Sequence, residues 1–218
     1  MFGAIGDAST WPHEKAPLQV SQFESDIKMD EHLGNIYLEG NGGGQSRESY
    51  ELAMYFMANH ISMDCLEKRG EKGYLFLMGD EMYYPEVNAE EVERIIGDKL
   101  EANIPTTEVV AKLQEQFEVF FIFTPSSGYP ISCSHPQKWK QLLPERVIIL
   151  DNIDDVCETI AGAIAMLEGA IDHDSLDSHL VDVGADPRTA ANVKNALAPL
   201  ANRSVAKADV KGDLISSG

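Results

Sequence analysis

The sequence predicts an α/β fold with a doubly wound, mostly parallel β-sheet, and two observations lead to this expectation. Three short runs are apolar without interruption, as in strands that helices cover on both faces; they span residues 73–78, 119–123 and 147–150. A helix start or a stretch with helical periodicity follows each run, and strands that alternate with helices are typical of parallel sheets. We therefore expect a Rossmann-type, three-layer arrangement.

The N-terminal region adds two strands and a short helix. Residues 1–7 form an apolar run that stops at Asp7, whereas residues 18–23 alternate apolar and polar side chains. Alternation indicates a half-buried strand at the edge of a sheet, with one face in water. A short helix is expected over residues 30–35.

A glycine-rich loop at residues 40–46 precedes the next helix. Ser46 is expected to cap that helix, which should reach about Met63, because its hydroxyl can accept from the free N–H groups of the first turn. The loop lacks the Gly-Lys-Ser/Thr ending of a phosphate-binding loop. A tight turn that needs positive backbone angles is the better interpretation.

Local signals mark the helix starts after the first long apolar run. Asn88, with Glu91 three residues later, is a variant of the capping box. A further helix should begin at about Thr106, directly after Pro105, and a short one at residues 134–137.

The helix after the last strand carries an apolar stripe at helical spacing. The stripe consists of Ile153, Val156, Ile160, Ile164, Leu167 and Ile171. Gly162 and Ala163 are expected to allow its close approach to the sheet. We place the α/β domain at residues 1–171 and treat residues 172–218 as a helical extension, with a helix start at Asp186-Pro187 and a frayed tail.

The net charge of the chain, −19 over 218 residues, restricts its partners. Such a surface repels phosphate backbones and anionic lipids, so neither nucleic acid nor membrane is an expected partner. The negative charge either serves only to keep the chain soluble, or it attracts divalent cations or a basic protein partner. The three cysteines are widely spaced, and neither a signal peptide nor a membrane-spanning stretch is recognisable, so a cytoplasmic protein is expected.

Acidic side chains follow three of the predicted strands, at the edge where open parallel sheets bind ligands. They are Asp7, Asp80 with Glu81, and Asp151. Carboxylates there can bind a divalent ion, because hard cations prefer oxygen ligands, although each could equally be a helix cap or a turn residue. Asp80 follows the most apolar strand and is the best candidate.

Nucleophilic catalysis has little support in the sequence. The chain contains no Gly-x-Ser-x-Gly elbow, and its six histidines are scattered. We therefore expect a binding module rather than an enzyme.

Five blocks of the sequence together resemble bacterial and phage-type von Willebrand factor A (vWA) domain proteins. The blocks are residues 3–7, 17–26, 39–45, 48–55 and 72–81, and the resemblance extends over residues 1–170. It implies a metal-ion-dependent adhesion site (MIDAS), which binds Mg²⁺ at the top of the sheet and takes an acidic residue of a partner. Asp80 matches the family's aspartate after the fourth strand, and Gln45 and Ser46 lie in the loop that supplies the family's threonine.

The chain departs from the vWA family at the first strand, because residues 1–3 resemble the start of the family's second strand. The family's primary metal motif, Asp-x-Ser-x-Ser, follows that strand, and this chain contains no such motif. In the family order 3-2-1-4-5-6 the missing strand is central, so an N-terminally incomplete sheet and an incomplete MIDAS are expected. The chain is then a fragment, or another chain supplies the strand, or family strands two and four pair directly.

These features predict a non-enzymatic protein–protein interaction module, and the resemblance implies partners such as AAA+ ATPases. A second hypothesis is a metal-dependent hydrolase or phosphotransferase that uses Asp7, Asp80 and Glu81. A third is a degenerate scaffold domain that associates through exposed sheet edges.

Overall fold

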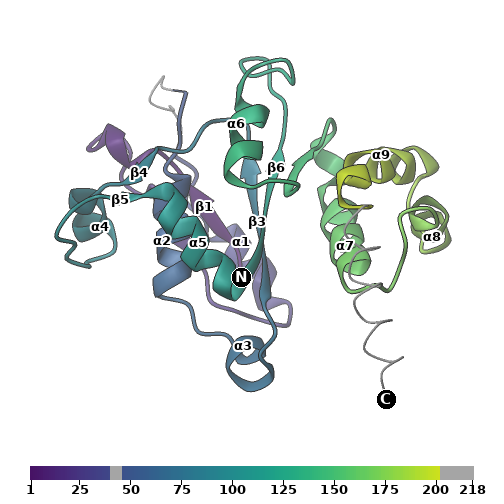
Figure 1. Ribbon diagram of the computed structural model, residues 1–218, viewed down its shortest axis with the longest axis horizontal. Coiled ribbons are helices and arrows are strands. Elements are labelled where there is room, and N and C mark those ends of the chain that lie inside the picture. Colours follow the sequence, from purple (N-terminus) through teal and green to yellow (C-terminus); the bar gives the residue numbers. More distant parts are fainter. Residues whose placement is uncertain (40–45, 202–218) are drawn as a thin grey trace, which may run out of the picture. The chain divides into compact units, whose positions relative to one another are not determined.

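The computed structural model describes residues 1–39 and 46–201, which divide into two compact units (Figure 1). The first unit comprises Met1–Gly73 and Glu81–Glu118. The second comprises Tyr74–Asp80 and the chain from Val119 onward. Gln45 and the predicted frayed tail lie outside the described residues.

A three-stranded sheet forms the centre of the second unit. Its strands, in order across the sheet, are β3 (Gly73–Gly79), β6 (Phe117–Phe123) and β7 (Val147–Ile149). β6 and β7 run parallel, with Phe121 opposite Val147. The three apolar runs of the sequence are therefore strands of one parallel sheet, and the predicted α/β class is confirmed.

Helices cover both faces of this sheet. They are α6 (His135–Leu142) on one face, and α7 (Val156–Leu167), α8 (Leu176–Asp182) and α9 (Pro187–Leu197) on the other. Phe120 and Ile122 are fully buried in one core with Leu197. Phe121 points to the opposite face and stacks on Trp139, with ring centroids 3.6 Å apart. Because alternate side chains leave a strand on opposite faces, β6 contributes to both apolar interfaces of the three layers.

The predicted apolar stripe of α7 faces the core over most of its length. Val156, Ile160, Leu167 and Ile171 are partly buried and pack against the core, whereas Ile153, which precedes α7, is 50% exposed. A Cβ atom at Gly162 would lie 3.1 Å from Cδ1 of Leu197, so this glycine permits the close approach of α9 rather than of the sheet. Helical periodicity identified the stripe, but it could not specify which element meets Gly162.

The residues after 171 belong to the same core. Val193 and Leu197 of α9 are fully buried together with side chains of the sheet. Asp155, buried just before α7, accepts hydrogen bonds from Thr189 Oγ1 at 2.8 Å and from Asn192 Nδ2 at 3.0 Å. The expected extension is thus a layer of the second unit, and the boundary predicted after residue 171 falls inside that unit.

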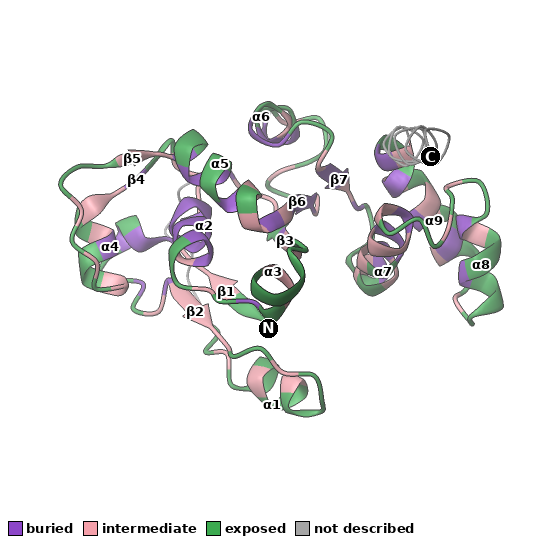
Figure 2. Cartoon of the chain, turned by 60° about the horizontal axis from the view of Figure 1, so that its bottom comes forward, coloured by how far each residue is buried: buried purple, intermediate pink, exposed green. Residues whose placement is uncertain are grey.

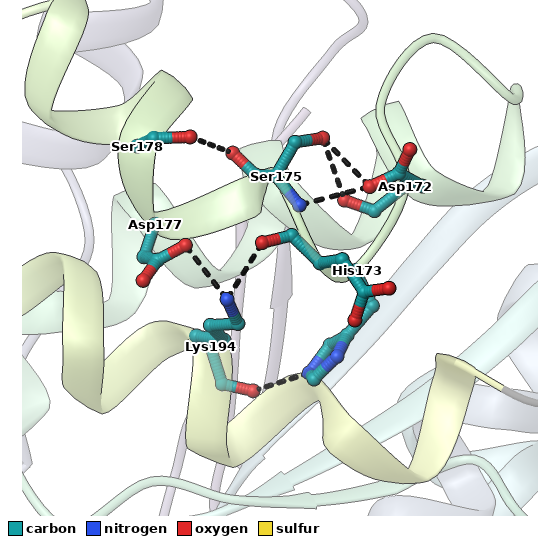
Figure 3. Close-up of polar contacts among 7 residues, drawn as sticks. Asp172, His173, Ser175, Asp177, Ser178 and Lys194 are labelled. Carbon is teal, nitrogen blue, oxygen red and sulfur yellow. Dashed lines mark hydrogen bonds and ion pairs between the residues drawn. The ribbon is translucent and has the colours of Figure 1, made fainter.

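Polar contacts hold α8 against α9, as Figure 3 shows. The Lys194 ammonium donates to the Asp177 carboxylate and to a backbone carbonyl ahead of α8, both at 2.7 Å. His173 Nε2 donates to the Lys194 carbonyl at 2.9 Å, since a carbonyl oxygen can only accept. Asp172 closes the turn before α8, because its carboxylate accepts from both the N–H and the hydroxyl of Ser175.

Short antiparallel strand pairs and helices build the first unit. Its helices and strands are β1 (Gly3–Ile5), β2 (Leu18–Val20), α1 (Lys28–Gly34), α2 (Tyr50–Asn59), α3 (Asp64–Arg69), β4 (Glu86–Val87), α4 (Ala89–Ile95), β5 (Ile104–Pro105) and α5 (Thr106–Gln116). β4 pairs with β5, and α2 packs against α5.

The expectation that the two N-terminal strands join the parallel sheet is wrong. β1 and β2 pair antiparallel with each other, from Gly3 opposite Val20 to Ile5 opposite Leu18, in a sheet of their own. Strands that follow one another in sequence commonly pair, and this pairing satisfies their backbone groups locally. Within the described part of the chain β1 does not pair with β3, so the account in which family strands two and four pair directly is not realised there.

Local helix signals hold in both units. Asn88 Oδ1 accepts from the N–H groups of Glu90 and Glu91 at the start of α4, and Asp186 accepts from the first turn of α9. α5 begins at Thr106, as expected. None of the helices in the described chain combines the length and apolar character that crossing a membrane requires.

Candidate functional site

The carboxyl ends of β3, β6 and β7 lie level with one another. The N–H of Thr124, just after β6, donates to the carbonyl of Gly79, the last residue of β3, at 3.0 Å. On the other side of β6, the N–H of Leu150 donates to the carbonyl of Phe123 at 2.9 Å. These hydrogen bonds carry the pairing to the strand ends, so the residues that follow share one edge of the sheet.

Three oxygen-bearing side chains follow the strands at this edge. Asp80 comes after β3 and Thr124 after β6, both partly buried, and the exposed Asp151 comes after β7. Because neighbouring strands are about 4.8 Å apart, the backbones at Asp80 and Thr124 are separated by one strand spacing. Phe123 pairs with Ile149, so Thr124 aligns with Leu150, and Asp151 lies two strands from Asp80 and one residue further along the chain. An ion at Asp80 could therefore reach the Thr124 hydroxyl, whereas Asp151 is placed for a contact through water or through a bound partner.

The start of α6 fixes the backbone at the end of β3. His135, the first residue of α6, is buried, and its Nδ1 lies 2.9 Å from the carbonyl oxygen of Asp80. Nδ1 carries the proton in this contact, because the carbonyl can only accept. The ring of Tyr129 packs against His135, with centroids 4.5 Å apart. In the sequence His135 is one of six scattered histidines, and only the predicted helix start at 134–137 draws attention to it.

A cavity of about 250 Å³ opens beside the end of β7. Its lining includes Ile131, Ile149, Leu150, Asp151, Asn192 and Asn195. One carboxylate and two amides thus face an apolar wall, which is the composition of a site that takes a side chain or a small polar group. The cavity lies within the second unit, between the end of β7 and α9.

The structure does not test the other two predicted metal ligands. Ser46 is exposed and belongs to the first unit, whereas Asp80 belongs to the second. Gln45 lies outside the described residues. Ligation by Ser46 and Gln45 therefore stays a prediction.

Ser46 does not cap a helix, contrary to the expectation. α2 begins at Tyr50, and the residue before it, Ser49, is buried with its hydroxyl accepting from the N–H of Ala8 at 2.9 Å. The Ser46 carbonyl instead accepts from the N–H of Met82 at 3.2 Å, next to an isolated parallel bridge. Because Arg47 pairs with Met82 and α2 begins only at Tyr50, no helical turn directly follows Ser46 for its hydroxyl to cap.

The first unit holds a cluster of buried acids that the sequence patterns do not reveal. Asp7, Glu14 and Glu51 are all buried. The Asp7 carboxylate accepts from the N–H of Ser9 at 2.9 Å and from the hydroxyl of Tyr84 at 3.1 Å, and Glu14 accepts from the N–H of Asp7. Acidic residues at strand ends and on helices are ordinarily exposed, so no sequence signal distinguishes these three.

Glu51 has the most perturbed carboxyl group of this cluster. Burial raises the pKa of Glu51 to about 8, and the N–H of Tyr84, which donates to it at 2.9 Å, opposes this shift. The nearby Glu91 and Asp7 add repulsion that favours the neutral form. Glu51 is therefore largely protonated at neutral pH, as perturbed carboxyls are in active sites and in buried structural networks.

Within residues 1–39 and 46–201, no group of three or more His, Cys, Asp or Glu side chains is arranged to hold a metal ion. The chain matches no known protein-family model, no curated protein and no solved structure. The carboxyl edge of the β3–β6–β7 sheet and the chemistry of its residues are thus the basis for a functional proposal.

Proposed function

We propose that the chain is a protein-interaction module of the vWA kind, in which Mg²⁺ at the carboxyl edge of the β3–β6–β7 sheet binds an acidic side chain of a protein partner. The observation that carries the proposal is the position of Asp80, one strand spacing from Thr124 at this edge. Ligands of open parallel sheets bind beyond the carboxyl ends of the strands.

The donor atoms at this edge suit Mg²⁺. Asp80 supplies a carboxylate and Thr124 a hydroxyl, and hard cations prefer oxygen ligands. Mg²⁺ is commonly held by one or two carboxylates and keeps several waters, so a site with few protein ligands remains open to an incoming carboxylate. When bound, the ion would supply the positive charge that draws an acidic side chain to a chain of net charge −19.

The chain's own residues would orient the site. His135 holds the Asp80 carbonyl and thereby sets the direction in which the Asp80 side chain leaves the backbone. The cavity beside Asp151 would receive neighbouring groups of the partner. An AAA+ ATPase as the partner is supported by the vWA resemblance alone.

Calorimetric titration of the full chain with Mn²⁺ and Mg²⁺ tests the metal-dependent part. We expect saturable binding to the wild type and roughly tenfold weaker or no binding to Asp80→Asn, because loss of the carboxylate removes the strongest ligand. Asp154→Asn is the matched control, since this exposed aspartate precedes α7 outside the sheet edge. Equal binding to all three proteins, or to none, contradicts the metal-dependent part.

A further inference from the structure

The segment from residue 23 to residue 38 exposes an unusual concentration of large apolar side chains. Five of the twelve that are exposed in the described chain lie there: Phe23 (50%), Ile27 (82%), Leu33 (51%), Tyr37 (63%) and Leu38 (85%). Single exposed apolar residues are normal on a protein surface, but several gathered in one short segment mark a contact surface.

The helix within this segment makes no contribution to the core. α1 contains no buried residue, as the absence of purple on it in Figure 2 shows. A helix of this length is not stable in water by its own hydrogen bonds. Its place must therefore be set by the chain on either side of it.

Polar clamps hold the C-terminal side of the segment to β2. The Gln19 side-chain amide donates to the carbonyl of Tyr37 and accepts from its N–H, both at 2.8 Å. The Glu39 carboxylate accepts from the N–H groups of Lys15 and Ala16 at 2.9 and 3.0 Å. The backbone is thus fixed by hydrogen bonds while the Tyr37 ring and the Leu38 side chain stay exposed, an arrangement that presents apolar groups instead of burying them.

A cavity of about 230 Å³ lies between β2 and α1, on the same segment. Its lining includes Val20, Ser21, His32, Asn35 and Ile36. Nδ1 of His32 is buried and has no hydrogen-bond partner among the residues that the structure describes. A buried nitrogen without a partner has lost its hydrogen bond to water, so a polar group that enters this cavity would gain by pairing with it.

The charge of the segment selects the partner. Acidic residues surround the apolar ones at Glu24, Asp26, Asp30, Glu31 and Glu39, against a single basic residue, Lys28. A second copy of this chain would bring the same acidic residues and a further net charge of −19 to the contact, which opposes association. A partner surface with basic residues and an apolar stripe complements both the acidic residues and the exposed apolar residues of the segment.

We infer that residues 23–38 form a docking surface for an amphipathic helical segment of a protein partner, with apolar residues on one side and Lys or Arg on the other. An apolar helix face laid on exposed apolar groups beside a small cavity is a recurring mode of recognition. The inference rests on the proposed class of function, the binding of a protein partner, but on none of the metal ligands. The surface is built by the first unit and needs no divalent ion.

Fluorescence anisotropy with labelled synthetic peptides tests the inference on the full chain, with EDTA present throughout. The probe is an amphipathic helix of about 18 residues with Leu on one face and Lys on the other, and a matched peptide carries Glu in place of Lys. We expect the basic peptide to bind and the acidic one not to bind. In Ile27→Ser/Leu38→Ser, binding should weaken at least roughly tenfold, because the variant loses two apolar side chains that the peptide would otherwise bury.

Two control pairs separate docking from general attraction to an acidic chain. Ile153→Ser/Val183→Ser removes two exposed apolar groups from the second unit, which are 50% and 68% exposed, and should leave the affinity unchanged. Asp30→Lys/Glu31→Lys should weaken binding more than Glu108→Lys/Glu115→Lys, which makes the same change of net charge on the exposed face of α5. All eight positions are exposed, so the fold should persist in each variant, which circular dichroism would verify.

Three outcomes overturn the inference. One is the absence of binding by the basic peptide, and another is an equal loss of affinity in both charge-reversal pairs with no loss in Ile27→Ser/Leu38→Ser. The third is displacement of the peptide by neutral phosphatidylcholine vesicles, which would assign the surface to lipid. Because the measurement is made in EDTA, failure of the metal titration leaves this result unaffected, and the two failures can be told apart.

Discussion

Both units of the chain bury apolar side chains, but the first also buries three acids. The second unit buries aromatic and aliphatic side chains such as Phe120, Ile122 and Ile148 around a parallel sheet. The first unit buries apolar side chains such as Leu52 and Leu113 together with the acids Asp7 and Glu51, beside short antiparallel strands. The stability of both units should therefore follow apolar area, and that of the first should depend in addition on the protonation of its buried acids.

This contrast also explains why one interior was easier to predict. An uninterrupted apolar strand can be recognised in the sequence, because such a strand is stable only where helices cover both faces of the sheet. A buried carboxyl is acceptable only where particular partners meet it, and those partners come from distant parts of the chain. The acids of the first unit are of this second kind.

The largest expected effect concerns the apolar interior. Phe120→Ala should destabilise the second unit by about 3–5 kcal/mol, because it removes a fully buried ring that stacks on Phe76 with centroids 5.0 Å apart. Urea unfolding, followed by the fluorescence of the buried Trp139 in a Trp11→Phe background, measures this loss. Phe23→Ala, which truncates a ring that is 50% exposed in the first unit, should change the free energy of unfolding by less than about 0.5 kcal/mol. Similar losses in the two variants would show that burial does not set the contribution of Phe120.

The next effect concerns the buried acid of the first unit and is a dependence on pH. The pKa of Glu51 is about 8 in the folded chain, above its ordinary value of 4.5, so between these values the folded state binds a proton that the unfolded state has released. The stability that Glu51 contributes is therefore complete below about pH 4.5 and is lost as the pH rises to about 8, by at most about 1.4 kcal/mol per pH unit.

Glu51→Gln should remove this dependence, because the amide stays neutral at every pH. The free energy of unfolding of the variant minus that of the wild type should rise between pH 5 and pH 8, measured by urea unfolding at several pH values. Glu108→Gln, at an exposed position of α5, is the matched control and should give a difference that does not vary with pH. A flat difference for Glu51→Gln would show that the buried acid does not control the stability of the first unit.

The smallest expected effect is the loss of a helix cap, which should cost the same free energy of unfolding in both units. Asn88 caps α4 in the first unit and Asp186 caps α9 in the second, each by accepting from N–H groups of the first turn. Asn88→Ala and Asp186→Ala should each cost about 1 kcal/mol, and Asn88→Ser should retain most of the stability, as thermal unfolding followed by circular dichroism would measure. Unequal losses of stability would mean that the packing around each helix, and not the capping hydrogen bond, determines how much the cap contributes.

Elements with strong local signals were predicted correctly. β3, β6 and β7 follow uninterrupted apolar runs, and the starts of α4 and α9 follow a side chain that can accept from the first turn. In each case the residues that determine the structure are neighbours in the sequence. No residue far away in the sequence is needed to define these elements.

Predictions that needed a distant partner were wrong. Ser46 has the chemistry of a helix cap, but its carbonyl pairs with Met82, and the serine next to α2, Ser49, is engaged by Ala8. Helical periodicity could not specify which element meets Gly162, and the position of Leu197 decides that Gly162 faces α9. Both outcomes depend on contacts between residues that are far apart in the sequence. Gly162 and Leu197, the nearer pair, are separated by 35 positions.

The candidate site divides in the same way. The position of Asp80 at the carboxyl edge could be predicted, because it directly follows a recognisable strand. The alignment of Thr124 with it and the hydrogen bond from His135 to its carbonyl could not, since both depend on which strands and helices become neighbours.

By itself the sequence determined the α/β class, the three strands of the parallel sheet and the capped starts of α4 and α9, because short-range sterics, capping and apolar runs are properties of adjacent residues. Only the tertiary structure decided that β1 pairs with β2, that residues after 171 complete the second core, that Glu51 is buried, and that residues 23–38 expose their apolar groups. Burial and pairing are relations between residues far apart in the chain. Their free energy depends on the partner that each group meets, which no single segment specifies.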